Sequence, residues 1–99
     1  MKNLFVILIA YTKPLNAIEE ILSQHRAFLS KGYESGYLLA SGPQNPKTGG
    51  IVIGKFDSKE CAEEFFKHDP YAQNNAATYQ ILEFTPVLHH TLLESFLEI

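Results

Sequence analysis

The stretch YLLASGPQNPKTGGIVIGKF, Tyr37–Phe56, decides the fold because it places two apolar runs on either side of a polar connection. The runs Tyr37–Pro43 and Ile51–Phe56 are rich in aliphatic and aromatic residues, which favour strands. The connection QNPKTGG between them is rich in Gly, Pro and Asn, which favour turns. The pattern predicts two neighbouring antiparallel strands, and a connection longer than a tight hairpin needs is expected to cover something on the folded chain.

A helical pattern precedes these strands. Apolar residues recur at three- and four-residue spacing from Ile18 to Leu29, which predicts a helix over about residues 17–31. Asn16 and Glu19 have the spacing of a capping box at the start of this helix, and a following glycine supplies its end.

A second helical pattern follows the strands. Asp57, with Glu60 three positions later, predicts another capped helix, and Asp69 marks its last turn because Pro70 disfavours helical geometry in the preceding residue. The lone cysteine falls on the apolar side with no basic neighbour to lower the pKa of its thiol, so we expect a core residue and not a nucleophile. The expected inner face of this helix consists of Cys61, Ala62, Phe65 and Phe66.

Two further apolar runs, Leu4–Tyr11 and Tyr79–Phe84, predict strands at the two ends of this arrangement. The order strand, helix, strand, strand, helix, strand predicts an α+β fold of the ferredoxin-like βαββαβ type. Its antiparallel sheet carries both helices on one face. With 99 residues, of which 45% are hydrophobic, the chain is long enough for one core and too short for two, so residues 1–99 are expected to form a single domain.

Composition and charge exclude several classes of partner. Eight basic against eleven acidic residues give a formal charge of −3 with no basic run, so nucleic acid is not an expected partner. The lone Cys61 cannot form an internal disulfide, which favours a reducing compartment. The N-terminal MKNLFVILIAY resembles a secretory signal, but its short apolar run Leu4–Ala10 is more typical of a buried strand. We therefore expect a cytoplasmic protein with no membrane span.

The C-terminal tail, residues 86–99, contains VLHHTLLESFLEI, with apolar residues at helical spacing. A sheet with helices on only one face leaves its other face to be covered, and a second copy of the chain is the most economical cover. The sequence therefore predicts a homodimer or a higher homo-oligomer, with this tail at the interface.

The candidate chemistry rests on His25 and Asp69. His25 falls on the apolar stripe of the first helix, and Asp69 continues the inner edge of the second, so the two side chains are expected to approach each other. A carboxylate bonded to one imidazole nitrogen fixes the tautomer and leaves the other nitrogen for general acid–base catalysis. The alternative is that His25 is a packing residue and Asp69 only a helix-end residue.

Two motifs resemble those of a known family. LSQHRAFLSKGYESGYLLASGPQ, residues 22–44, and FKHDPY, residues 66–71, look like segments of the YciI-like, or YCII-related, family of small bacterial proteins. The resemblance covers most of the chain, from the first strand through residues 81–84. It implies a ferredoxin-like fold, dimers of the α+β-barrel type, and an active site centred on His25 and Asp69.

The same resemblance implies a binding surface beside that pair. Ser41, Gly42 and Pro43 match the family's SGP element as a wall of the cleft, and Tyr71 stands where the family usually has Phe. Related enzymes of the muconolactone-isomerase and chloromuconolactone-dehalogenase type act on small ring lactones by proton abstraction. An arginine often found one turn before the histidine is Leu22 here, which points to a neutral ligand or to lost activity if that arginine binds carboxylates in relatives. A glycine often found after the Asp-Pro-aromatic is also replaced, within residues 72–76.

Other polar residues give weaker evidence for a functional site. His68 lies next to Asp69, and His89 and His90 are adjacent, but neighbours in sequence point in different directions and their spacing matches no metal-ligand set. SGPQNPKTGG, residues 41–50, lacks the spacing of a phosphate-binding loop. No metal, nucleotide or other cofactor is expected.

Two functions remain open at this point. In the first, the protein is a lyase or isomerase in which His25 transfers a proton on a small organic molecule while Asp69 orients it. In the second, it is a non-catalytic module of the same fold that binds a metabolite or another partner. The fold does not choose between them.

Overall fold

The computed structural model describes residues 2–98, and the order of its elements confirms the predicted arrangement. A short additional helix, α3, precedes the last strand, and the tail forms two short helical turns. The elements are β1 (Leu4–Tyr11), α1 (Leu15–Glu34), β2 (Leu38–Pro43), β3 (Gly49–Lys55), α2 (Lys59–Phe66), α3 (Pro70–Gln73), β4 (Ala77–Phe84), η1 (Thr91–Leu93) and α4 (Glu94–Leu97).

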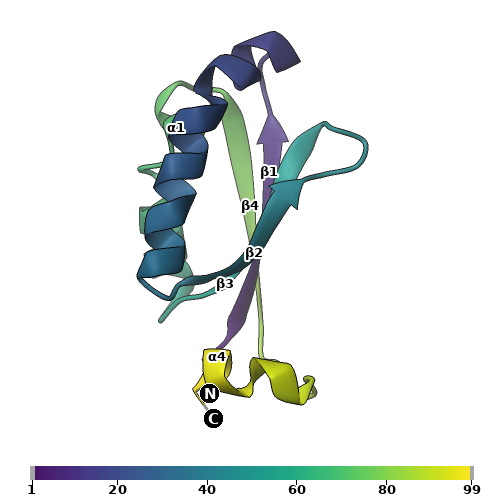
Figure 1. The fold of residues 1–99 in the computed structure, drawn as a ribbon, viewed down its shortest axis with the longest axis vertical. Coiled ribbons are helices and arrows are strands. Elements are labelled where there is room, and N and C mark those ends of the chain that lie inside the picture. Colours follow the sequence, from purple (N-terminus) through teal and green to yellow (C-terminus); the bar gives the residue numbers. More distant parts are fainter. Residues whose placement is uncertain (1, 99) are drawn as a thin grey trace.

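The four strands form one sheet in the order β2-β3-β1-β4, with every neighbouring pair antiparallel. Figure 1 shows α1 running alongside this twisted sheet, with the β2–β3 hairpin projecting beyond it. This is the ferredoxin-like α+β fold that the sequence predicts. Among residues 2–98, no helix combines the length and the apolar composition that a bilayer span requires.

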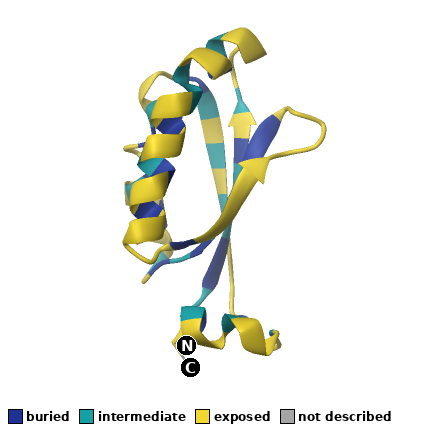
Figure 2. Ribbon diagram, in the orientation of Figure 1, coloured by how far each residue is buried: buried dark blue, intermediate teal, exposed yellow. Residues whose placement is uncertain are grey.

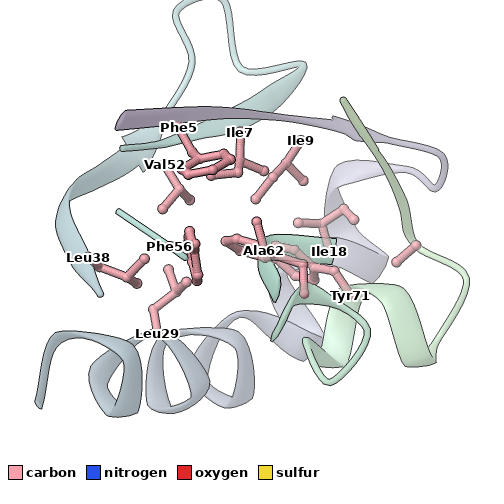
Figure 3. Close-up of a cluster of buried hydrophobic side chains, with 12 residues drawn as sticks. Phe5, Ile7, Ile9, Ile18, Leu29, Leu38, Val52, Phe56, Ala62 and Tyr71 are labelled. Carbon is pink, nitrogen blue, oxygen red and sulfur yellow. The ribbon is translucent and has the colours of Figure 1, made fainter. Parts of the chain in front are cut away.

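The core lies between one face of the sheet and the helices. Phe5, Ile7 and Ile9 alternate along β1 and are almost fully buried, because successive side chains of a strand point to opposite faces. Figure 3 shows these side chains pointing from the sheet toward Ile18 and Leu29 of α1. Figure 2 shows the buried positions of α1 on the side that faces the sheet. Ala62 and Phe66 of α2 belong to the same buried cluster, so α1 and α2 cover the same face.

Helix α1 begins earlier than predicted, and the expected capping box at Asn16 is wrong. Pro14 is the residue before the helix, and its carbonyl accepts hydrogen bonds from the backbone N–H groups of Ala17 (2.9 Å) and Ile18 (3.1 Å). Proline already has the φ angle that leads into a helix, here −59°, so the helix starts at Leu15 without a side-chain cap.

The start and inner face of α2 also differ from the prediction. Ser58 caps the helix by accepting from the Cys61 N–H at 3.1 Å, whereas Asp57 binds the Lys2 ammonium at 2.7 Å. Cys61 is exposed, so its assignment to the core is wrong. Successive helical residues are rotated by about 100°, and Ala62 is the one of this neighbouring pair that faces the sheet.

Asp69 lies beyond α2, which ends at Phe66, so it does not sit in the last turn of that helix as predicted. It is instead the residue that caps α3, in an extended conformation with φ −65° and ψ 129°. The extended conformation is the one expected before Pro70, the first residue of α3. The Asp-Pro pair therefore begins a helix and turns the chain back toward α1.

One glycine fixes the approach of β3 to β1. A Cβ atom at Gly49 would lie 1.8 Å from the Ile9 carbonyl oxygen, far inside contact distance. Any side chain here would push the start of β3 away from β1. Gly49 thus holds the base of the β2–β3 hairpin, from which the connecting loop projects.

The other face of the sheet is apolar and largely uncovered within the chain. Val6 and Leu8 of β1 are half-buried, while Leu82 and Phe84 of β4 are 44% and 47% exposed. Together with Leu39 of β2, which is 37% exposed, these residues define what we call the outer face. No element between Lys2 and Glu98 packs over its centre (Figure 1).

The tail divides into a packed end and an exposed stretch. Leu97 is fully buried, and Lys55 of β3 holds the tail by donating to the Phe96 carbonyl and lying 4.7 Å from the centre of the Phe96 ring. Val87 and Leu88, by contrast, are 76% and 92% exposed. The predicted single apolar stripe is therefore split, because its last residues fold back on their own chain.

Candidate active site

Helix α1 directs His25 toward the sheet, as its place on the apolar stripe predicts. The residue is buried, with 8% of its surface exposed. Its ring stacks on that of Tyr71 with centroids 4.0 Å apart and an interplanar angle of 14°. The imidazole is thereby held in one plane against the wall formed by α3.

Asp69 meets His25 at the point where α3 begins. The distance between His25 Nδ1 and Asp69 Oδ1 is 2.8 Å, and the Asp69 side chain has no exposed surface. The same oxygen accepts from the Tyr71 backbone N–H at 3.1 Å, which is the capping bond of α3. One carboxylate oxygen thus links α1 to α3.

A third donor reaches the other oxygen of this carboxylate. The Tyr79 hydroxyl, on β4, donates to Asp69 Oδ2 at 2.7 Å. Burial, and then the hydrogen bond to Asp69, raise the pKa of Tyr79 well above its usual value, so this phenol stays protonated and remains a donor. Asp69 therefore has three donors, from α1, α3 and β4, which is what a buried carboxylate needs to be stable.

This arrangement fixes the tautomer of His25. A carboxylate beside Nδ1 requires that nitrogen to carry its proton, so in the neutral ring Nε2 is the acceptor. Nε2 makes no hydrogen bond to any other group in the described part of the chain. Because His25 also lines a cavity, the free nitrogen is available to a bound molecule.

The cavity has a volume of about 210 Å³ and lies between α1 and the β2–β3 hairpin. Drug-sized ligands occupy about 300–1,000 Å³, so this cavity fits a molecule of about one ring. The three residues of the SGP element and Tyr71 all line it, whereas Asp69 does not line it and is fully buried. The predicted residues at the cavity wall are His25, Ser41, Gly42, Pro43 and Tyr71.

Ser41 is oriented by a neighbour on α1. Its hydroxyl lies 2.7 Å from the Tyr33 hydroxyl, and one of the two donates a hydrogen bond to the other. Residues 41 and 43 of β2 pair with Val52 and Gly50 of β3, and this register points Ser41 and Pro43 toward the cavity side of the sheet. The loop that follows β2 also contributes Lys47 to the lining.

Four side chains that line the cavity or bond to Asp69 escaped the sequence reasoning. Tyr79 could have been found from alternation along its strand, because it pairs with Ile9 and so shares the inner face. Tyr11 could have been found in the same way, since it continues the Phe5–Ile9 alternation. Arg26 and Lys47 gave no periodic signal, because both are exposed and line the cavity from its rim.

The remaining histidines serve local structure. His90 caps η1 by accepting from the Leu92 N–H at 3.0 Å, and His89 Nδ1 lies 2.9 Å from the Pro86 carbonyl. His68, two residues beyond the end of α2, is exposed and lies 3.5 Å from the Glu64 carboxylate. From residue 2 to residue 98, no three His, Cys, Asp or Glu side chains are grouped as a metal site would require.

Comparisons with known proteins support the family and the fold. A family model described as the YCII-related domain matches residues 4–85. A solved structure of 5-chloro-2-hydroxyhydroquinone dehydrochlorinase from Burkholderia phenoliruptrix AC1100, in complex with 2,5-dihydroxybenzoquinone, superposes with a TM-score of 0.71. At 18% identity the match covers 83% of this chain and 93% of that one, and it shows a shared fold. No curated protein matches the sequence.

Proposed function

The chain belongs to the family of YCII-related domains, and from this premise we propose that it is a small acid–base enzyme of the lyase or isomerase type. The observation that carries the proposal is the 2.8 Å contact between His25 Nδ1 and Asp69 Oδ1, buried beside a cavity that His25 lines. A histidine with one nitrogen bound to a carboxylate and the other facing a cavity is the minimal unit for moving a proton at neutral pH.

Each residue has a distinct role in this proposal. His25 Nε2 takes a proton from a carbon next to a substrate carbonyl, and Asp69 orients the ring and balances the charge of the imidazolium that forms. In an isomerase the proton returns at another carbon, whereas in a lyase the electron pair of the broken C–H bond expels a leaving group. Ser41, Gly42, Pro43 and Tyr71 form the surface on which the substrate rests.

The substrate we propose is a small oxygen-bearing ring. Two observations support this size and class: the cavity of about 210 Å³, and the 2,5-dihydroxybenzoquinone bound by the dehydrochlorinase that shares the fold. Loss of hydrogen chloride is a lyase reaction and needs a base, which is the role that the proposal gives to His25. Lactones and enolisable ring acids belong to the same size range.

The test is hydrogen–deuterium exchange of the acidic C–H of small lactones, enolisable acids and hydroxylated quinones, followed by NMR with and without the protein. General acid–base catalysis contributes about 10²–10⁴-fold, so His25→Gln should lower the exchange rate by that factor. His89→Gln changes a half-buried histidine of the tail that does not line the cavity, so it is the matched control and should leave the rate unchanged. Asp69→Asn should also slow exchange, because an amide can donate to Nδ1 and select the wrong tautomer.

The same variants separate catalysis from simple binding. A non-catalytic module would bind these compounds and exchange no proton, and His25→Gln would change affinity alone. Nitrogen-15 NMR of the imidazole reports the tautomer directly: the proton should lie on Nδ1 in the wild type and shift toward Nε2 in Asp69→Asn. An unchanged exchange rate in His25→Gln would refute the enzymatic proposal.

We further propose that the chain acts as a single domain in a homodimer, in the cytoplasm. The outer face supports the dimer, because half-exposed Leu82 and Phe84 are energetically costly to leave in water. The 76–92% exposure of Val87 and Leu88 supports a place for the tail at the same interface. The free, exposed Cys61 thiol is compatible with a reducing compartment. If light scattering at micromolar protein concentration gives the mass of a monomer, the proposed dimer is refuted.

A further inference from the structure

The rim of the cavity carries unpaired positive charge. Arg26 of α1 and Lys47 of the β2–β3 loop both line it, and neither forms a salt bridge with a described residue. Glu19 is the carboxylate among the lining residues, since Asp69 does not line the cavity and its oxygens already accept from three donors. A cavity with two free cations favours a ligand of negative charge.

A second, independent feature points to the same kind of ligand. Tyr71 is 1% exposed and lines the cavity, and its hydroxyl is the buried side-chain polar atom without a hydrogen-bond partner in the described residues. It lies near the Tyr11 hydroxyl, but the geometry between the two does not make a hydrogen bond. A buried donor without a partner is costly, so a group supplied by a bound molecule would stabilise it.

The protonation state of Tyr71 makes it a donor. Burial first, and then the neighbouring Tyr11 and Asp69, raise the pKa of Tyr71 to about 12, so the phenol keeps its proton at neutral pH. The Arg26 guanidinium has the opposite and smallest influence on the pKa of the same group, in the direction expected of a nearby cation. A ligand oxygen at this hydroxyl would therefore meet a hydrogen-bond donor and a cation together.

We propose that Tyr71 and Arg26, assisted by Lys47, bind an anionic oxygen of the substrate, so the substrate is a single-ring molecule that carries a carboxylate or an ionised enol. This inference rests on the proposed function, whose substrate class it narrows. Because the Tyr71 ring stacks on His25, one small molecule can place an acidic C–H at Nε2 and its charged oxygen at Tyr71. The negative charge released by proton removal then develops near a donor and a cation, where it is most stabilised.

The apolar residue at position 22 does not contradict a charged ligand. Leu22 and Arg26 are four residues apart on α1 and both line the cavity, as residues on one helix face do. The cavity thus has a cation, Arg26, one turn of α1 beyond Leu22. Under this proposal, the preference for a neutral ligand that Leu22 suggests in the sequence does not hold.

The test compares a charged with an uncharged probe by titration calorimetry. The charged probe is 2,5-dihydroxybenzoquinone, which is ionised at neutral pH, and the uncharged probe is hydroquinone, a phenol that is not. The wild type should bind the anion at least about tenfold more tightly, as expected when a charged group accepts hydrogen bonds. Tyr71→Phe and Arg26→Gln should each remove about tenfold of the affinity for the anion and leave that for hydroquinone unchanged.

Matched controls come from the same elements of the chain. Lys31→Gln removes a cation from α1 outside the cavity, and Tyr37→Phe removes a hydroxyl from an exposed ring, so both should bind the anion as the wild type does. Equal affinity for the two probes, no measurable binding of the anion, or equal losses in Arg26→Gln and Lys31→Gln would each overturn the inference.

The outcome is separable from that of the proposed function. Selective anion binding that Arg26→Gln abolishes, together with a proton-exchange rate that His25→Gln does not change, would keep the anion site and refute the enzyme. Proton exchange that depends on His25, together with anion affinity that does not depend on Arg26 or Tyr71, would keep the enzyme and refute the anion site.

Discussion

The two faces of the sheet contain similar apolar residues and differ in how far these residues are buried within the chain. On the inner face, Phe5 and Ile7 are buried by the helices, and the one buried carboxylate, Asp69, has three hydrogen-bond donors. On the outer face, Leu82 and Phe84 remain nearly half exposed. The inner face is complete within one chain and the outer face is not, so the fold separates the residues of the site from those available to a partner.

The largest expected effect is on the inner face. Asp69→Ala would leave His25 Nδ1, the Tyr71 N–H and the Tyr79 hydroxyl without an acceptor in a buried place. Removing one member of a buried charged network costs about 3–5 kcal/mol, a large part of the 5–15 kcal/mol that stabilises a domain. Urea denaturation should show this loss. A change below about 1 kcal/mol would mean that the network is not closed as described.

The next effect should appear on the outer face. The double variant Leu82→Lys, Phe84→Lys should weaken the proposed dimer by about 30-fold or more. The two apolar side chains that the dimer would bury are then replaced by charged ones, so their contribution to association is lost. Sedimentation velocity over a concentration series measures this. Glu63→Lys on exposed α2 changes the net charge by the same amount and should leave association intact. If both variants associate equally, the outer face is not the interface.

The smallest expected effect comes from removing the donor to one oxygen of Asp69 while the other oxygen keeps its donors. Tyr79→Phe removes the donor to Oδ2 and leaves Oδ1 with His25 and the Tyr71 N–H, so the expected loss of unfolding free energy is about 1.5 kcal/mol. The His25 tautomer should stay as in the wild type. Loss of the Nδ1 proton signal in Tyr79→Phe would show that the tyrosine orients the histidine as well.

This variant should also change the response to alkaline pH. The pKa of Tyr79 is raised in the folded chain, so above about pH 10 the unfolded chain releases this proton while the folded chain keeps it. The stability that Tyr79 contributes is complete below pH 10 and is lost as the pH rises. Tyr79→Phe should therefore have a flatter stability profile above pH 10 than the wild type.

The fold could be predicted from the sequence because the spacing of apolar residues along a strand or helix reflects which of its sides is buried. Alternation along Leu4–Tyr11 and the three- and four-residue spacing from Ile18 to Leu29 both reflect contact with the inner face. The same reasoning placed His25 on the buried side of α1. It failed at Cys61, where one residue of rotation moved the side chain from the core to solvent.

The ends of the helices were harder to predict because several polar residues compete for them. Asn16, Asp57 and Asp69 each have the chemistry of a cap, but only Asp69 caps a helix in the structure, and it begins α3 where the sequence reasoning placed it at the end of α2. Pro14 and Ser58 occupy the other two positions. Sequence spacing shows which residues could cap and gives no information on where the chain turns.

The site was predicted in part. The approach of His25 and Asp69 followed from the two helices lying on one face, although Asp69 reaches His25 from the start of α3. Tyr79 reaches the pair through the register of its strand, and Arg26 lines the cavity from an exposed position. Both facts become visible only in the folded chain. Long-range pairing of this kind has no local signal.

The three bonds of Asp69 also constrain how the family can diverge. A lineage can exchange Tyr79 for phenylalanine and still keep a paired carboxylate, but an exchange at position 69 breaks contacts to α1, α3 and β4 in a single step. Relatives should therefore lose the tyrosine on β4 before they lose the aspartate. Where the aspartate has been lost, the histidine should be free to change as well, and relatives that lack both residues should also lack the proposed proton transfer.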